Sequence, residues 1–124
     1  MGTLPSSVAI VDDDASVRKA LSRLLSSFEL SNETFGSGQE FLDSLAVHRP
    51  KCVVLDHHMP EMTGLDLQHH LRRRGFHIPT IIMTAHDQPG LREQCHSAGA
   101  VAFLLKPLNE GDLISAVSRA VAAR

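Results

Sequence analysis

The hydrophobic positions of this 124-residue chain alternate between short apolar runs and longer amphipathic stretches. Apolar runs of four to six residues are typical of strands covered on both faces, and apolar residues spaced three and four apart are typical of helices. The pattern predicts five strands that alternate with five helices. The strands are expected at residues 7–11, 30–35, 52–55, 79–84 and 101–105, and the helices at 15–28, 37–47, 64–74, 88–98 and from 109 onward.

Several helix ends carry local signals. Ser37 and Glu40 form a capping-box pattern, and Asn109 is expected to cap the last helix. Gly75 and Gly99 are expected to follow the ends of the third and fourth helices. The residues expected on the buried face of the first helix are Val17, Ala20, Leu21, Leu24, Leu25 and Phe28.

Strands that alternate with helices imply an α/β domain in which a parallel sheet has helices on both faces. The polar content of residues 30–35 suits a strand at the edge of that sheet. In such doubly wound sheets, ligands bind beyond the carboxyl ends of the strands, where the strand order reverses. We therefore expect a single domain over residues 1–124, with its functional site at that edge of the sheet.

Charge and hydropathy limit the classes of function. The net charge is −2 with neutral histidines, which argues against direct nucleic-acid binding by this domain. No apolar run reaches the length of a membrane span, and the first residues lack the basic and apolar regions of a signal peptide. Cys52 and Cys95 are isolated, so we expect two buried, reduced thiols and a cytoplasmic location.

Chemically active residues stand where four of the predicted strands end. Asp12 and Asp13 follow the first strand, Asp56 follows the third, Thr84 ends the fourth and Lys106 follows the fifth. Because parallel strands bring these ends to one edge, three carboxylates would repel one another unless a cation such as Mg²⁺ lay among them. A carboxylate beside Mg²⁺ can attack phosphorus, while an ammonium and a hydroxyl meet the phosphoryl oxygens. These residues favour Asp56 as a phosphoryl acceptor.

The same residues lie in motifs that resemble the receiver domain of two-component response regulators. The motifs are IVDDD at 10–14, VVLDHHMPEMTG at 53–64, MTA at 83–85 and LKP at 105–107. The resemblance covers about residues 7–122 and implies a flavodoxin-like fold with strand order 2-1-3-4-5, an order for which the family is a known example. VDDD, MTAHD and AGAVAFLLKP are similar to receivers joined to LuxR-type DNA-binding domains. We expect a fragment that lacks its output domain, with a stand-alone receiver as the alternative.

The resemblance implies a role for each site residue. Asp56 is the implied phosphoacceptor, and the Lys106–Pro107 peptide bond is expected to be cis. The implied Mg²⁺ ligands are Asp12, Asp13, Asp56 and the backbone carbonyl of His58. The implied switch residues are Thr84, Lys106 and the aromatic Phe103.

The implied function is a signalling switch rather than a turnover enzyme, although self-catalysed phosphotransfer and autodephosphorylation are expected. A sensor histidine kinase would phosphorylate Asp56, and the phosphoryl group would shift the domain between two states. The shift would reshape the face made by the fourth helix, fifth strand and fifth helix. It would also favour a weak dimer through the fourth helix and fifth strand, and regulate an output, most simply transcription.

Many relatives carry Arg or Asn two residues after the phosphoacceptor, where this chain has His58, and His86 stands two residues after Thr84. In the family, the side chains at these two positions flank the phosphoryl group. Because an unperturbed histidine titrates near pH ~6.5, this pair is a candidate for tuning the acyl-phosphate lifetime between about pH 6 and 7.5. The alternative is that both are solvated loop histidines.

Other functions are less compatible with the motifs. An Asp-nucleophile phosphatase would place a second Asp where this chain has His58, and a nucleotide or flavin binder would want a Gly-rich loop in place of the three aspartates. A degenerate receiver that acts only by protein binding stays open. A zinc site at Asp66, His69 and His70 competes with an exposed helix face, and residues 72–74 are interpreted as a basic helix end rather than a phosphate contact.

Overall fold

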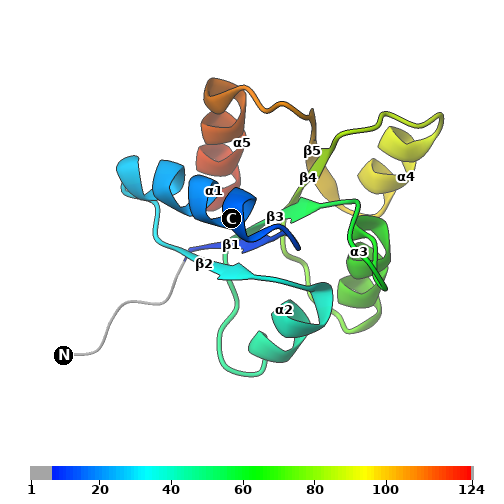
Figure 1. Cartoon of the computed structure of the whole chain (residues 1–124). Helices are drawn as coiled ribbons and strands as arrows, with labels where there is room; N and C mark the ends of the chain where they lie inside the picture. The colour runs from blue at the N-terminus through cyan, green and yellow to red at the C-terminus, as the bar shows by residue number, and fades with distance from the viewer. Residues whose placement is uncertain (1–6, 124) are drawn as a thin grey trace.

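The computed structural model describes residues 7–123, in which five parallel strands form one sheet in the order β2-β1-β3-β4-β5 (Figure 1). The strands are β1 (Val8–Val11), β2 (Asn32–Phe35), β3 (Cys52–Asp56), β4 (Thr80–Thr84) and β5 (Ala100–Leu105). The helices are α1 (Ala15–Ser27), α2 (Gly38–Ser44), α3 (Gly64–Arg73), α4 (Leu91–Ser97) and α5 (Glu110–Ala122). The predicted fold class and strand order are confirmed. Residues 1–6, in which we expect no signal peptide, lie outside the described part of the chain.

Helices cover both faces of the sheet (Figure 1). Alternate residues of β1 enter two separate cores because successive strand side chains point to opposite faces. Val8 and Ile10 pack with residues of α1 and α5, whereas Ala9 and Val11 pack with residues of α2, α3 and α4. β3 and β4 are buried along their whole length, as their nearly uninterrupted apolar sequences predicted.

The beginning of α4 differs from the prediction. Residues 88–98 were expected to be helical, but the helix begins at Leu91. Gly90 has a φ of 83°, which lies in the left-handed region and is incompatible with an α-helical turn. The residues of the MTAHD motif therefore continue into an irregular link between β4 and α4.

Two other helical expectations need correction. α2 ends at Ser44 rather than near residue 47, and the chain continues in turns that leave Val47 91% exposed. Phe28 and Ala20 were expected on the buried face of α1, but both are exposed, and Phe28 follows the last helical residue as its C-cap. Leu21 and Leu25 are the buried residues of this helix.

The register of the sheet assembles the site. Val11 pairs with Leu55, so the next residues, Asp12 and Asp56, emerge side by side at the carboxyl edge. The backbone N–H of Lys106 donates to the carbonyl oxygen of Thr84 at 2.8 Å, which joins the ends of β5 and β4 at the same edge. Within residues 7–123, no helix combines the length and the hydropathy that a membrane crossing requires.

Candidate functional site

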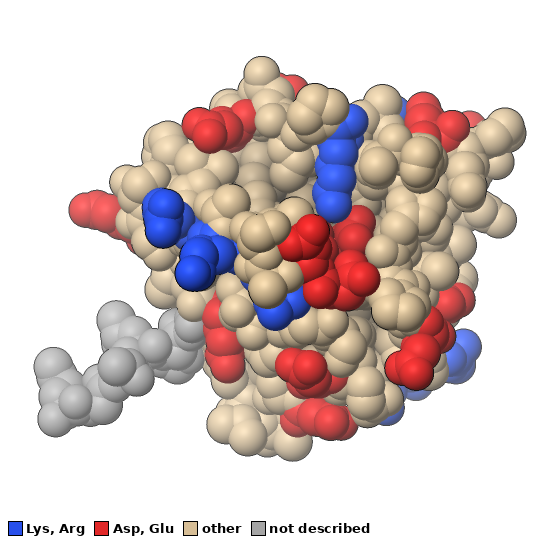
Figure 2. Space-filling view, viewed as in Figure 1, with Lys and Arg blue, Asp and Glu red and all other residues tan. Residues whose placement is uncertain are grey.

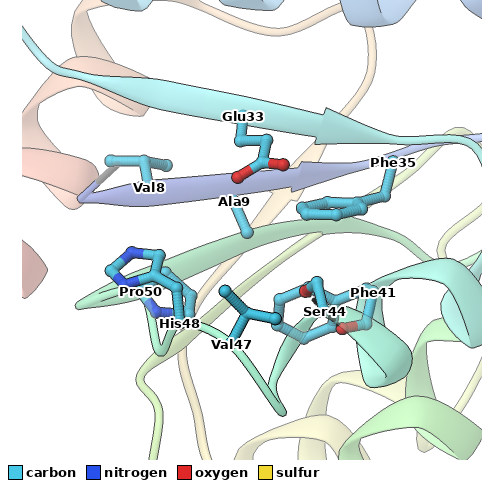
Figure 3. A pocket seen from close by; sticks show the side chains of 9 residues that line it. All are labelled: Val8, Ala9, Glu33, Phe35, Phe41, Ser44, Val47, His48 and Pro50. Carbon is cyan, nitrogen blue, oxygen red and sulfur yellow. Dashed lines mark hydrogen bonds between the residues drawn. The ribbon is translucent and has the colours of Figure 1, made fainter. Parts of the chain in front are cut away.

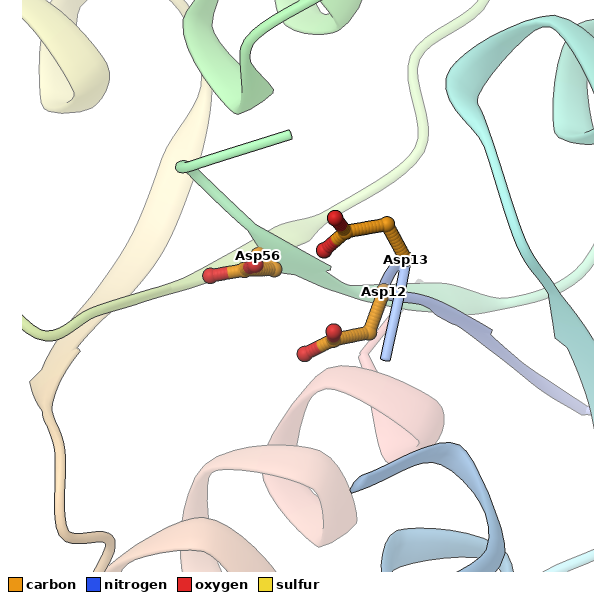
Figure 4. Close-up of side chains that lie close together, drawn as sticks. All are labelled: Asp12, Asp13 and Asp56. Atoms are coloured by element: carbon orange, nitrogen blue, oxygen red, sulfur yellow. The ribbon is translucent and has the colours of Figure 1, made fainter. Parts of the chain in front are cut away.

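Three carboxylates meet at the carboxyl edge of the sheet (Figure 4). Oxygen atoms of Asp12, Asp13 and Asp56 lie within 4.8 Å of one another. Asp12 is 1% exposed and Asp56 is 4% exposed, whereas Asp13 is exposed to solvent. Figure 2 shows acidic side chains gathered beside a basic one on this face of the molecule. The predicted acidic cluster therefore exists, with one member open to solvent.

Lys106 supplies the positive charge beside this cluster. Its Nζ atom lies 3.4 Å from Oδ2 of Asp12 and 3.4 Å from Oδ1 of Asp56. Partial burial lowers the pKa of Lys106, but the two carboxylates outweigh it, and the pKa is raised above its usual value. The ammonium is thus held in its charged form next to the proposed acceptor. The Lys106–Pro107 peptide bond is cis, as expected.

Burial raises the pKa of Asp12 above its usual value, and the neighbouring charge of Asp56 acts in the same direction. The backbone N–H of Asp14, which donates to Oδ1 of Asp12 at 2.9 Å, and the Lys106 ammonium oppose the shift only in part. The single ammonium of Lys106 therefore does not fully compensate the negative charge of the two buried carboxylates. An added cation would relieve this repulsion.

The donor set fits Mg²⁺, which prefers oxygen ligands and binds through one or two carboxylates together with water and phosphate oxygens. Asp12, Asp13 and Asp56 would hold such an ion, and they form the only group of three or more potential metal-binding side chains among residues 7–123. The alternative zinc site at Asp66, His69 and His70 is not assembled. Asp66 instead caps its own helix.

Thr84, the last residue of β4, is fully buried and sits in a compact hydrogen-bond arrangement. Its Oγ1 atom donates to the carbonyl oxygen of His86 at 3.0 Å and accepts from the backbone N–H of His86 at 3.1 Å. Nε2 of His58 lies 2.8 Å from the same oxygen atom. Because the hydroxyl has one hydrogen, every group is satisfied when His58 carries a proton on Nε2 and donates it to Thr84.

The rings of His58 and His86 pack edge to face with centroids 5.4 Å apart. The two histidines were predicted only as candidates, with solvated loop residues as the alternative. The structure places both at Thr84: one through its imidazole and the other through its backbone. The hydrogen bond of the His58 side chain joins residues 26 positions apart, and no local signal in the sequence indicates it.

The loop that carries Asp56 into α3 is tightly built around Gly64. A Cβ atom at this position would lie 3.0 Å from Cα of His57 and 3.1 Å from the carbonyl oxygen of Asp56. The N–H of Gly64 donates to the carbonyl oxygen of His57 at 3.0 Å. Thr63 and Asp66 then form a complete capping box at the start of α3. This box is readable from the sequence but was not predicted.

His57 is the first residue of this loop and is 7% exposed, with no partner for its Nδ1 atom among the described residues. Burial lowers its pKa, and the adjacent His58 acts in the same direction. A neutral imidazole at this position adds no charge to the acidic cluster.

Phe103 lies on β5 opposite Ile82 of β4, and its ring is partly buried against the core that faces α4. The guanidinium of Arg92 on α4 lies 4.6 Å from the centroid of this ring. The proposed aromatic switch residue is therefore in contact with α4.

A separate hollow of about 230 Å³ lies between β1, β2 and the link that follows α2 (Figure 3). Its lining residues are Val8, Ala9, Glu33, Phe35, Phe41, Ser44, Val47, His48 and Pro50. The lining is mainly apolar and includes none of the predicted site residues, so this hollow is separate from the acidic cluster at the carboxyl edge of the sheet.

Comparison with known proteins agrees with this geometry. The family described as "Response regulator receiver domain" matches residues 8–118. The chain is 43% identical over 117 residues to the transcriptional regulatory protein TdiR of Thauera aromatica, which covers 94% of the chain and 52% of TdiR. It is 39% identical over 121 residues to the response regulator protein TodT of Pseudomonas putida, which covers 98% of the chain and 53% of TodT. The chain thus spans about half the length of these relatives.

A solved structure, that of FixJ-N, superposes with a TM-score of 0.88 at 31% sequence identity and covers 98% of both chains. The likeness therefore extends over nearly the whole chain.

Proposed function

Because this chain belongs to the family of response regulator receiver domains, we propose that it is a phosphorylation-activated switch with Asp56 as the phosphoryl acceptor. The observation that carries the proposal is the placement of Lys106, whose ammonium lies 3.4 Å from both Asp12 and Asp56 at the edge where three carboxylates converge. Receivers are signalling domains rather than turnover enzymes. The donor would be a sensor histidine kinase.

In the transfer step, an oxygen of the Asp56 carboxylate forms a bond to phosphorus. The bond between phosphorus and the donor breaks, and its electron pair leaves with the phosphohistidine nitrogen of the kinase. Lys106 is placed to meet the oxygens of the transferring group, where negative charge develops. Asp12, Asp13, Asp56 and the backbone carbonyl of His58 would hold Mg²⁺, which supplies positive charge for the same oxygens when bound.

The switching step would begin at Thr84. Once a phosphoryl group is present, the Thr84 hydroxyl and the Lys106 ammonium gain a new acceptor, and these gains favour the phosphorylated state. For Thr84, the gain competes with its present bonds to His58 and His86. Movement of Thr84 would alter the packing of Phe103 and reshape the face made by α4, β5 and α5.

The output of this change would be control of transcription. The names of TdiR and TodT describe a transcriptional regulatory protein and a response regulator, and both are about twice as long as this chain. We propose that the receiver occupies about residues 7–122 of a longer cytoplasmic regulator, with a DNA-binding output domain of the LuxR type. Phosphorylation would favour a weak dimer through α4 and β5. Light scattering that gives an unchanged monomer mass after phosphorylation would argue against the dimer.

Intact-protein mass spectrometry after incubation with acetyl phosphate and Mg²⁺ tests the acceptor. Wild type should gain one phosphoryl group that hydroxylamine removes, and the gain should be lost without Mg²⁺ and in Asp56→Asn. Asp43→Asn, an exposed aspartate on α2, is the matched control and should still be phosphorylated. No adduct in any protein would indicate a degenerate receiver that acts by protein binding alone. An adduct in Asp56→Asn would exclude Asp56 as the acceptor.

A further inference from the structure

The two ends of α4 are held in different ways. At its amino end, Gly90 provides no side-chain cap, and the ion pair between Arg92 and Asp87 is exposed with a separation of 3.9 Å. Exposed pairs of this kind contribute little to stability. Leu91 is buried in the core, but apolar packing is not directional and does not by itself fix the orientation of a helix.

At the carboxyl end of α4, two side chains of α3 donate hydrogen bonds to its last carbonyl groups. Nε2 of Gln68 lies 3.0 Å from the carbonyl oxygen of Cys95, and Nη1 of Arg72 lies 2.9 Å from that of Ser97. Residues four positions apart lie on the same side of a helix, so Gln68 and Arg72 form one row that faces α4. Both acceptors belong to the final turn, where helix carbonyls have few backbone partners. The Cys95 carbonyl also accepts from the backbone N–H of Ala98 at 3.2 Å, so Gln68 adds a second donor to it.

The Gln68 side chain is fixed in one orientation. It is 2% exposed, and the Cys95 carbonyl can only accept, so the amide nitrogen must face α4. Its Oε1 atom then has no hydrogen-bond partner among the described residues. A buried acceptor without a partner is unfavourable, and an apolar residue at this position would avoid that cost. Within residues 7–123, the hydrogen bond to the Cys95 carbonyl is the one hydrogen bond of this buried side chain.

We propose that Gln68 and Arg72 are positioning residues that fasten the carboxyl end of α4 to α3. The helix then responds to a change at Thr84 by tilting about its fastened end. Its amino end follows the link that begins directly after Thr84, and Arg92 at this end covers Phe103. The tilt therefore moves the part of α4 that contacts the aromatic switch. This inference rests on the proposed function, because it assumes that phosphorylation changes Thr84.

Residue-resolved amide exchange by NMR tests the fastening in the unmodified protein. Gln68→Leu removes both the hydrogen bond to the Cys95 carbonyl and the unpaired Oε1 atom. Arg72→Met, a substitution at an exposed position, removes the hydrogen bond to the Ser97 carbonyl. Either change should accelerate exchange of the Ala98 and Gly99 amides about fivefold, the factor that corresponds to one net hydrogen bond. Gln39→Leu on the exposed side of α2 makes the same chemical change elsewhere and should leave these amides unaltered.

The response to phosphorylation tests the tilt. In wild type, phosphorylation should alter amide exchange at residues 86–93 and leave residues 95–99 within twofold of the unmodified protein. In Gln68→Leu the altered region should extend through residue 99. A general loss of stability would not redistribute the response in this way, and urea unfolding of each variant measures that stability directly.

Two results would overturn the inference: unchanged exchange at Ala98 and Gly99 in both variants, or a wild-type response as large at residues 95–99 as at 86–93. The phosphoryl adduct is measured by mass on the same samples. If wild type gains no adduct, the proposed function fails, and the unmodified variants alone decide whether the end of α4 is fastened.

Discussion

The imidazole of His58 reaches the Thr84 hydroxyl, with 2.8 Å between Nε2 and Oγ1. This contact links His58, two positions after Asp56, to the last residue of the neighbouring strand β4. It holds Thr84 in the position seen here, where the hydroxyl also bonds to the backbone of His86. A residue beside the acceptor thus restrains the hydroxyl that we propose as the switch.

The first prediction concerns this restraint. His58→Leu should let Thr84 turn toward a phosphoryl group more readily, so phosphorylation by acetyl phosphate should become faster, by up to about fivefold if one net hydrogen bond is lost. A mass-spectrometric time course measures the rate. His69→Leu, at an exposed position of α3, is the control. A slower reaction in His58→Leu would show that the imidazole assists the transfer instead.

The pH profile of dephosphorylation examines the same contact. The sequence-based hypothesis that His58 and His86 tune the acyl-phosphate lifetime between about pH 6 and 7.5 predicts that the lifetime of phosphorylated wild type changes over this window. The profile of His58→Leu should be flatter, and His86→Leu separates the contribution of the second ring. A flat wild-type profile over this window would exclude lifetime tuning by either histidine.

The second prediction concerns Asp12. Burial raises the pKa of Asp12 above the usual value of 3.8. Between these two pKa values the folded state keeps the carboxyl proton, whereas the unfolded state has lost it. Stability from this group is greatest below pH 3.8 and declines as the pH rises through the raised pKa. Asp12→Asn should therefore be more stable than wild type at pH 7, by about 1 kcal/mol, and should lack this decline.

Urea unfolding followed by far-UV circular dichroism measures the difference, because the chain contains no Trp or Tyr. Mg²⁺ binds the folded state and should raise the stability of wild type more than that of Asp12→Asn. Lower stability of the variant at pH 7 without Mg²⁺ would mean that the ion pair with Lys106 outweighs the cost of burial.

The third prediction concerns Gly64. Gly64→Ala would bring a methyl group to within 3.0 Å of the His57 backbone, which cannot move without displacing Asp56. We expect a loss of about 1–3 kcal/mol in the free energy of unfolding, together with slower phosphorylation. Gly36→Ala is the matched control, because its new Cβ would meet only the flexible side chains of Arg18 and Glu40 at 3.4 Å or more. Equal effects at the two positions would contradict the tight packing.

The fourth prediction concerns the cysteines. Burial raises the pKa of Cys52 to about 12 and also raises that of Cys95, and both thiols are fully buried. The thiolate is the reactive form, so the folded protein should resist iodoacetamide at pH 8, whereas the protein in urea should gain two adducts. Rapid labelling of the folded protein would show that one of these sites opens.

The amino-acid sequence by itself determined the order of strands and helices. Strands and helices bury different patterns of side chains, so the spacing of apolar residues distinguishes one kind of element from the other along the chain. It also determined that Asp12, Asp56 and Lys106 would meet, since parallel strands end at one edge whatever their neighbours are. The sequence also predicted a capping hydrogen bond between residues three positions apart: the Ser37 side chain accepts from the backbone N–H of Glu40 at 3.1 Å. Glu40 itself reaches the N–H of Gly36 rather than that of Ser37, so the expected capping box is incomplete.

Only the tertiary structure decided which side chains meet across distant segments. The contacts of His58 with Thr84, Gln68 with Cys95 and Arg72 with Ser97 join residues 26, 27 and 25 positions apart. No periodicity or capping rule encodes such pairs, because they depend on how far each helix is rotated and shifted on the sheet. That placement results from the packing of the whole core. The sequence therefore identified the residues at the strand ends. The tertiary structure decided how these residues are connected to α4 and to the face that we propose changes on phosphorylation.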